Sequence, residues 1–152
     1  MADTQPTEDL RLHELLNCTG FNLRKATRSI TQLYNTALAP TKLLITQFSI
    51  LAILAAYNPC SIKLCSEELG MDPTTLSRNL RPLERRQLVQ RSIDMEDQRA
   101  QVLELTAQGR QALQEAQPYW QAAQTQVIST MGEDNWQHLL FNLRLLAEMK
   151  DR

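Results

Sequence analysis

One stretch of the sequence reads Met71-Asp72-Pro73-Thr74-Thr75-Leu76-Ser77-Arg78-Asn79-Leu80-Arg81-Pro82-Leu83-Glu84-Arg85-Arg86. Asp72 is a good helix N-cap because its carboxylate can accept hydrogen bonds from the amides of the first turn, and Pro73 suits the first helical position, where no N–H is needed. At about 100° per residue, the leucines of this stretch share one face. They are Leu76, Leu80 and Leu83. The stretch therefore predicts a helix that begins at Pro73 and packs on its leucine face.

Hydroxyl and guanidinium side chains dominate the rest of this predicted helix. They belong to Thr74, Thr75, Ser77, Arg78, Arg81 and Arg85. An arginine can donate two parallel hydrogen bonds to the O6 and N7 atoms of a guanine, and a helix fits the major groove of DNA. A charged helical face can also be no more than a solvated surface. The neighbouring stretches favour the first of these two interpretations.

The stretches before and after this helix complete the pattern of a winged helix-turn-helix. Residues 62–69 predict a short helix, and Gly70 stands where a left-handed residue would end it. Two runs with partial apolar and polar alternation follow, at 88–91 and 101–105, and the polar residues between them predict a hairpin tip. A hairpin beside a helix-turn-helix is a wing. It would carry Arg99 towards the phosphates or the adjacent minor groove of bound DNA.

The wing also carries a family resemblance. Its second half reads Asp97-Gln98-Arg99-Ala100-Gln101-Val102-Leu103-Glu104-Leu105-Thr106-Ala107-Gln108-Gly109-Arg110. This run is similar to the D-x-R…L-x-L-T-x-x-G signature of the MarR (multiple antibiotic resistance regulator) family, and residues 69–72 and 74–80 add to the match. The resemblance implies a cytoplasmic, homodimeric transcriptional regulator, often a repressor that is released by a small ligand or by thiol oxidation. It also implies that Asp97 and Arg99 form the wing motif.

The predicted fold class is mainly α with a small β-wing, in which a winged helix-turn-helix is flanked by dimerisation helices. We expect the chain, residues 1–152, to be one unit with the DNA-binding region at 43–106 and dimerisation helices at 7–38 and 107–150. Residues 7–38 are expected to form one continuous helix, because their apolar side chains follow helical spacing. A second helix should begin after a Thr46 cap and be buried, since apolar side chains surround most of it.

The last predicted helix has two apolar faces. Phe141, Leu145 and Met149 lie roughly opposite the face that contains Trp136. A helix that is apolar on both sides must be covered on both, and a second copy related by two-fold symmetry is the simplest cover. We therefore expect this stripe and Leu15 to take part in a homodimer interface, although a helix buried within one chain would show the same pattern.

Composition and charge exclude several other classes of protein. The 152 residues are 43% hydrophobic and 22% charged, which is an ordinary soluble composition. The net charge of −1 argues against a surface coated with basic charge, but it allows a local basic patch. The start of the chain lacks the pattern of a signal peptide, and no apolar run is long enough for a bilayer, so we expect a cytoplasmic protein without a membrane segment.

No catalytic or metal-binding constellation stands out in the sequence. The phosphate-loop, zinc-protease and nucleophile-elbow motifs are missing, and the two histidines, His13 and His138, have no ligand partners at suitable spacing. The sequence therefore predicts neither an enzyme nor a protein with a cofactor or metal.

Two kinds of effector remain open. A pocket between the dimerisation and DNA-binding parts could be lined by Phe21 and Phe48, with Arg24 or Arg28 available to hold a carboxylate, which suits an aromatic acid. Such a ligand would weaken DNA binding if it preferred a conformation in which the two recognition helices are misspaced.

The second possibility is thiol sensing. The three cysteines are irregularly spaced and do not predict a disulfide framework. Cys65 replaces an aliphatic position and should be buried and inert, whereas Cys60 is expected in an exposed loop. The region of Cys18 resembles that of the organic hydroperoxide-sensing branch of the MarR family. It departs from that branch because Gly20, and not a cysteine, precedes Phe21, and Arg24 stands in place of a tyrosine.

A different class of function also fits a winged helix, namely a module that binds another protein without reading a DNA sequence. The polar face of the predicted recognition helix discriminates between the two classes, because protein-binding surfaces more often carry apolar anchors. The hydroxyls and guanidiniums at this face favour DNA.

Overall fold

The computed structural model describes residues 12–95, 97 and 100–149 of the chain, which divides into two compact units at residues 1–33 and 34–152. In the first unit, α1 covers Leu12–Leu16, and α2 begins at Thr19 and continues to Leu38 in the second unit. The expectation of one continuous helix over 7–38 is therefore wrong, and residues 7–11 lie outside the described part.

The break between α1 and α2 has a local cause. Asn17 and Cys18 lie between the two helices, and these residues as well as Thr19 and Gly20 after them have low helix propensity. The side-chain amide of Asn22 donates to the carbonyls of Leu16 and Cys18, at 2.7 and 3.0 Å. These two carbonyls at the interruption of the helix therefore have hydrogen-bond partners.

The second unit begins with the end of α2, a short 3-10 helix η1 at Ala39–Thr41, and α3 at Ile45–Ala56. We expected Thr46 to cap α3, but this expectation is wrong. The helix begins at Ile45 with Leu44 as its N-cap residue, so Thr46 lies inside the first turn. The side chain of Gln47 supplies the capping interaction instead, since its Oε1 accepts from the Leu44 amide at 3.0 Å. Burial of α3 is confirmed, because Ile50 and Leu51 are fully buried.

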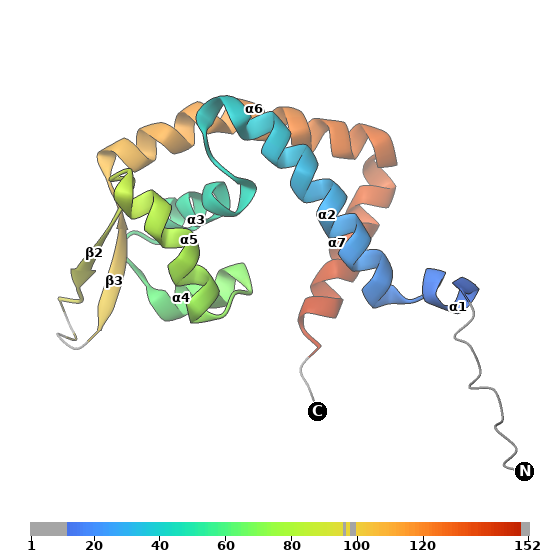
Figure 1. Cartoon of the computed structure of the whole chain (residues 1–152), viewed down its shortest axis with the longest axis horizontal. Helices are drawn as coiled ribbons and strands as arrows, with labels where there is room; N and C mark the ends of the chain where they lie inside the picture. The colour runs from blue at the N-terminus through green and yellow to red at the C-terminus, as the bar shows by residue number, and fades with distance from the viewer. Residues whose placement is uncertain (1–11, 96, 98–99, 150–152) are drawn as a thin grey trace, which may run out of the picture. The chain divides into compact units, whose positions relative to one another are not determined.

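The winged helix follows α3. It consists of β1 (Cys60–Ser61), α4 (Ile62–Leu69), α5 (Pro73–Arg85), β2 (Val89–Ile93) and β3 (Gln101–Leu105). The three strands form an antiparallel sheet in the order β1-β3-β2, and α4 and α5 lie next to the β2–β3 hairpin in Figure 1. Strand β1 was not expected from the sequence. It pairs Cys60 with Leu103 and Ser61 with Val102.

Two helices complete the chain: α6 (Ala107–Met131) leads away from β3, and α7 (Glu133–Ala147) follows at Gly132 (Figure 1). Both starts have local causes in the sequence. The hydroxyl of Thr106 caps α6 by accepting from the amide of Gly109 at 2.9 Å. Glu133 and Asp134 occupy the first turn of α7, where negative charge is favoured by the helix dipole.

One hydrophobic core holds the winged helix and the first half of α6 together. Leucine side chains from α2, α3, α5 and β3 are fully buried in it, and Ala116 and Trp120 pack against it from α6. Each buried leucine contributes about 1.5–3 kcal/mol relative to an exposed one. The fully buried leucines are Leu38, Leu43, Leu51, Leu54, Leu76, Leu80, Leu83 and Leu103.

In the described part of the chain, no single helix is both long and apolar enough to cross a membrane, and only the bent pair Thr19–Thr41 and Ile45–Ala56 would pass by length and composition together.

Candidate nucleic-acid interface

The start of α5 is fixed by Asp72, as the sequence predicts. One carboxylate oxygen, Oδ1, accepts from the amides of Thr74 and Thr75, both at 2.9 Å, and Oδ2 accepts from the Thr75 hydroxyl at 2.6 Å. The Thr75 hydroxyl is the main reason that the pKa of Asp72 lies below its usual value, and the amide hydrogen bonds of the cap act in the same direction. The hydroxyl proton of Thr75 is thus committed to the cap.

The turn before α5 depends on Gly70. This residue has a φ of +59°, in the left-handed region, where side chains other than glycine are strained. Its amide donates to the Glu67 carbonyl at 3.2 Å, and the next amide, of Met71, donates to the Ser66 carbonyl at 2.9 Å. This pair of hydrogen bonds ends α4 within one residue and sets the direction of α5.

The two faces of α5 are separated as expected. Its three leucines have no exposed surface, whereas Thr74 and the arginines Arg78, Arg81 and Arg85 are exposed, and Thr75 and Ser77 are half-buried. Among the described residues the ion pairs are Lys63–Glu67 and Glu84–Arg91, so the three arginines have no carboxylate partner there. Their guanidiniums are therefore available to an anionic ligand such as DNA.

The wing is an antiparallel hairpin in which Val89 pairs with Leu105 and Ile93 with Gln101. Glu104 on β3 accepts from the Gln90 side-chain amide and the Ser92 hydroxyl on β2, at 2.7 and 2.5 Å. The hydrogen bond from Ser92, and after it that from Gln90, holds the pKa of Glu104 below its usual value. They link the strands side by side and so fix their register.

The tip of the wing is closed by backbone hydrogen bonds. The Asp94 amide donates to the Ala100 carbonyl at 2.9 Å, and the Ala100 amide donates to the Asp97 carbonyl at 2.8 Å. Asp97, half of the predicted wing motif, is exposed and takes part in this turn. Arg99, the other half, lies outside the described residues.

Two arginines connect α5 to other elements, and neither was singled out from the sequence. Arg91 on β2 binds the Glu84 carboxylate on α5, with Nε and Oε1 2.5 Å apart, so the wing is tied to the recognition helix. Arg86, just after α5, donates to the carbonyls of Lys42 and Thr41 at 2.8 and 3.4 Å. No local pattern could reveal the second link, because its partners are more than 40 residues away.

The expected exposure of Cys60 is wrong. This residue lies in β1, opposite Leu103, and has no exposed surface. Pairing with β3 brings Cys60 into the core. A strand of two residues is too short to show the apolar and polar alternation from which a strand is predicted. Burial raises the pKa of its thiol.

Cys65 is buried, as predicted, and burial with the neighbouring Cys60 raises the pKa of its thiol to about 12. A thiol with such a pKa is a poor nucleophile at neutral pH because almost none of it is thiolate. Cys18, which precedes α2, is exposed. It is therefore the one cysteine of this chain with an accessible thiol.

The residues predicted to form an effector pocket belong to different units. Phe48 is 7% exposed and stacks on Trp120 in the core of the second unit, with ring centroids 5.7 Å apart. Phe21, half-buried, and the exposed Arg24 and Arg28 lie on the part of α2 that belongs to the first unit. Their joint pocket stays a prediction.

The predicted dimerisation stripe is uncovered in the single chain. Phe141, Leu145 and Met149 are 59%, 50% and 74% exposed, and Leu15 on α1 is half-buried. Monomeric proteins seldom expose several large apolar side chains together, so this stripe is suited to an interface.

Comparisons with known proteins agree with this geometry. The model of the MarR family matches residues 43–100, which contain α3, the helix-turn-helix and most of the wing. An uncharacterised HTH-type transcriptional regulator of Bacillus subtilis (strain 168), YwaE, is 29% identical over 94% of this chain and 83% of its own length.

Two solved structures are also similar. The transcriptional regulator MosR of M. tuberculosis, in complex with DNA, is 34% identical over 86% of this chain and 94% of its own, with a TM-score of 0.78. The transcriptional repressor CouR, bound to a 23-mer DNA duplex, is 28% identical over 92% and 99%, with a TM-score of 0.82. With its winged helix and its cationic α5, the chain therefore belongs to the MarR family of DNA-binding transcriptional regulators, which are not enzymes.

Proposed function

We propose that the protein is a repressor that binds an inverted-repeat operator as a homodimer, with α5 of each copy in a major groove. The observation that carries this proposal is the exposed face of α5, where Arg78, Arg81 and Arg85 lack carboxylate partners among the described residues. Two such helices related by a two-fold axis would contact half-sites about one helical turn, roughly 34 Å, apart. CouR, whose chain is similar over nearly its full length, is a repressor bound to a DNA duplex.

The roles within the interface follow from position. Arg78 lies in the second turn of α5, next to the exposed Thr74, and is proposed to donate to a guanine edge. Arg99 in the wing is proposed to contact phosphates, and Arg81 and Arg85 further along α5 add positive charge towards the DNA backbone. The link between Glu84 and Arg91 would hold the wing at a fixed angle to α5 while both are on the duplex.

Gel shifts with operator and scrambled duplexes test these roles. Arg78→Ala should cost about 1–3 kcal/mol on the operator and flatten the preference at one base pair of each half-site. Arg99→Ala should weaken binding to all sequences alike and reduce the salt dependence. Arg110→Ala removes the same charge from an exposed site on α6 and serves as the control. If Arg78→Ala and Arg110→Ala had equal effects on operator and scrambled DNA, the assignment of base reading to α5 would be wrong.

The alternative, a winged-helix module that binds only proteins, is less well supported. The exposed positions of α5 carry a proline, a threonine and three arginines, and none of them carries an aromatic side chain. Hot spots of protein–protein interfaces are enriched in tryptophan and tyrosine as well as arginine. A protein-binding module would also show no preference among DNA sequences, which the gel shifts measure directly.

Release from DNA is proposed to depend on a small effector. An aromatic acid held by Phe21 with Arg24 or Arg28 would act if it favoured a conformation in which the two α5 helices are misspaced. Thiol oxidation is the second candidate. It is confined to Cys18, because Cys60 and Cys65 are buried.

A further inference from the structure

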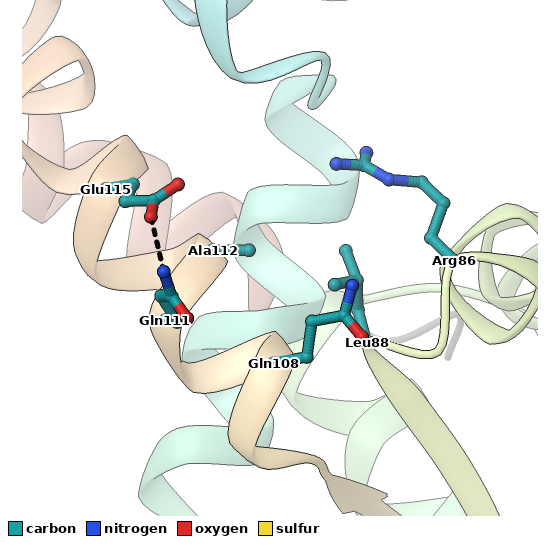
Figure 2. Close-up of a pocket in the computed structure, with 6 residues that line it drawn as sticks. All are labelled: Arg86, Leu88, Gln108, Gln111, Ala112 and Glu115. Atoms are coloured by element: carbon teal, nitrogen blue, oxygen red, sulfur yellow. Dashed lines mark hydrogen bonds between the residues drawn. The ribbon is translucent and has the colours of Figure 1, made fainter.

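A surface depression of about 420 Å³ lies between the end of α5, the start of β2 and the N-terminal part of α6 (Figure 2). Its volume falls within the range of small-molecule sites. The lining residues are Arg86, Leu88, Gln108, Gln111, Ala112 and Glu115. None of them belongs to the predicted effector pocket, and none contributes to the exposed face of α5.

Two opposite charges face this depression from different elements. Figure 2 shows Arg86 on one side and Glu115, on α6, on the other. The ion pairs found among the described residues, Lys63–Glu67 and Glu84–Arg91, include neither of them, so neither charge is neutralised by the other across the opening.

Each of the two charged groups keeps hydrogen-bonding capacity. The guanidinium of Arg86 uses one N–H of each terminal nitrogen on the neutral carbonyls of Lys42 and Thr41, which leaves three of its five N–H donors. Glu115 accepts from Gln111 with Oε1, at 2.9 Å, which leaves its second oxygen (Figure 2). The two carbonyl contacts also hold the guanidinium in place, so little side-chain entropy remains to be lost on binding.

The base of the depression between the two charges is firmly placed. Leu88 is 2% exposed, and Ala112 of α6 lies beside it. The carbonyl of Leu88 accepts from both the amide and the hydroxyl of Thr106, at 3.2 and 3.1 Å, which joins β2 to the start of α6. The depression therefore exists without a ligand and does not have to form on binding.

We propose that this depression binds a small zwitterion. Its carboxylate pairs with the guanidinium of Arg86, its ammonium group pairs with Glu115, and a short apolar spacer joins the two ends across Ala112. The side-chain amides of Gln108 and Gln111 lie on the same wall and offer further donors and acceptors to either end. A simple carboxylate or a simple amine leaves one of the two charges without a partner, so each binds more weakly. The site is independent of the operator and of the thiol of Cys18.

Titration of the full-length protein with defined probes, followed by NMR and calorimetry, tests the proposal. The probes are the ω-amino acids from 4-aminobutanoate to 8-aminooctanoate, together with 4-(aminomethyl)benzoate. The comparison compounds are 4-methylbenzoate and benzylamine, each of which carries only one of the two charges. At least one zwitterion should bind saturably, and about three- to tenfold more tightly than either comparison compound.

Variants identify the site. Glu115→Gln should lower the affinity for the zwitterion about three- to tenfold and leave that for 4-methylbenzoate unchanged. Glu133→Gln is the matched control, because Glu133 also accepts from a glutamine one helical turn away: Gln137 donates to it at 3.0 Å, as Gln111 donates to Glu115. Failure of every zwitterion to bind, equal binding of zwitterions and singly charged compounds, or equal affinities in the two variants would each overturn the proposal.

Discussion

Gly109→Ala should destabilise the winged helix by separating the start of α6 from β2. A Cβ at position 109 would lie 2.0 Å from the carbonyl oxygen of Leu88 and 2.7 Å from Cδ1 of Leu105. Real Cβ atoms essentially never come within 3.0 Å of another heavy atom, so the two backbones would have to move apart by at least about 1 Å. The obstacle is a backbone atom of Leu88, the residue just before β2, and a backbone atom cannot rotate away as a side chain can.

The size of the effect follows from the contacts that this movement breaks. The Leu88 carbonyl accepts from the amide and the hydroxyl of Thr106, and each neutral hydrogen bond of this kind contributes about 0.5–1.5 kcal/mol. Overpacking destabilises the fold further, by about 1–3 kcal/mol, whereas the higher helix propensity of alanine stabilises it by about 1 kcal/mol. The free energy of unfolding should therefore fall by about 3 kcal/mol, which lowers Tm by about 6–12 °C in a chain of this size.

Urea denaturation followed by circular dichroism measures this loss, and Gly20→Ala is its control. Gly20 also lies near the start of a helix, but the nearest heavy atom to its added Cβ is Sγ of Cys18, at 4.0 Å. This variant should be more stable than the wild type by about 0.5–1 kcal/mol. If Gly109→Ala unfolded at the same urea concentration as the wild type, the close packing of α6 on β2 would not exist.

Three further predictions concern assembly, pH and oxidation. Leu145→Glu places a charge in the exposed α7 stripe, so sedimentation should show a folded monomer with lost operator affinity; an intact dimer would place the interface elsewhere. Because the folded pKa of Glu104 is lowered, its stabilising contribution is complete above the ordinary glutamate pKa of about 4.3 and is lost as the pH falls through the folded value. Glu104→Gln should thus lose stability relative to wild type at about pH 6, and the difference should shrink at about pH 3; a constant difference in urea titrations would refute this. Peroxide should release wild type but not Cys18→Ser from DNA if the thiol is the sensor, and identical responses would exclude Cys18.

The features that could be predicted from the sequence are those with local causes. Three residues set the helix-turn-helix locally: Asp72 accepts from amides two and three residues later, Pro73 fits the first helical position, and Gly70 adopts the left-handed conformation that ends α4. Their positions in the sequence are therefore sufficient. Thr106 predicts the start of α6 for the same reason. The leucine face of α5 follows from helical spacing alone.

The features that were missed depend on distant partners or on competing local choices. Cys60 is buried because a two-residue strand pairs with β3, more than 40 residues later. The hydrogen bonds of Arg86 to the Thr41 and Lys42 carbonyls span a similar separation. The break at residues 17–18 was hidden because the apolar spacing continues through it, while the side-chain amide of Asn22 satisfies the carbonyls that the break exposes.

Selection of bound sequences from random duplex DNA, carried out in parallel with wild type and Arg78→Ala, tests most directly the proposal that α5 reads DNA sequence. The wild type should enrich an inverted repeat whose half-sites are centred about one helical turn apart, and Arg78→Ala should lose the preference at one base pair in each half-site. Enrichment of no common sequence, or equal affinity of the wild type for selected and scrambled duplexes, would contradict it.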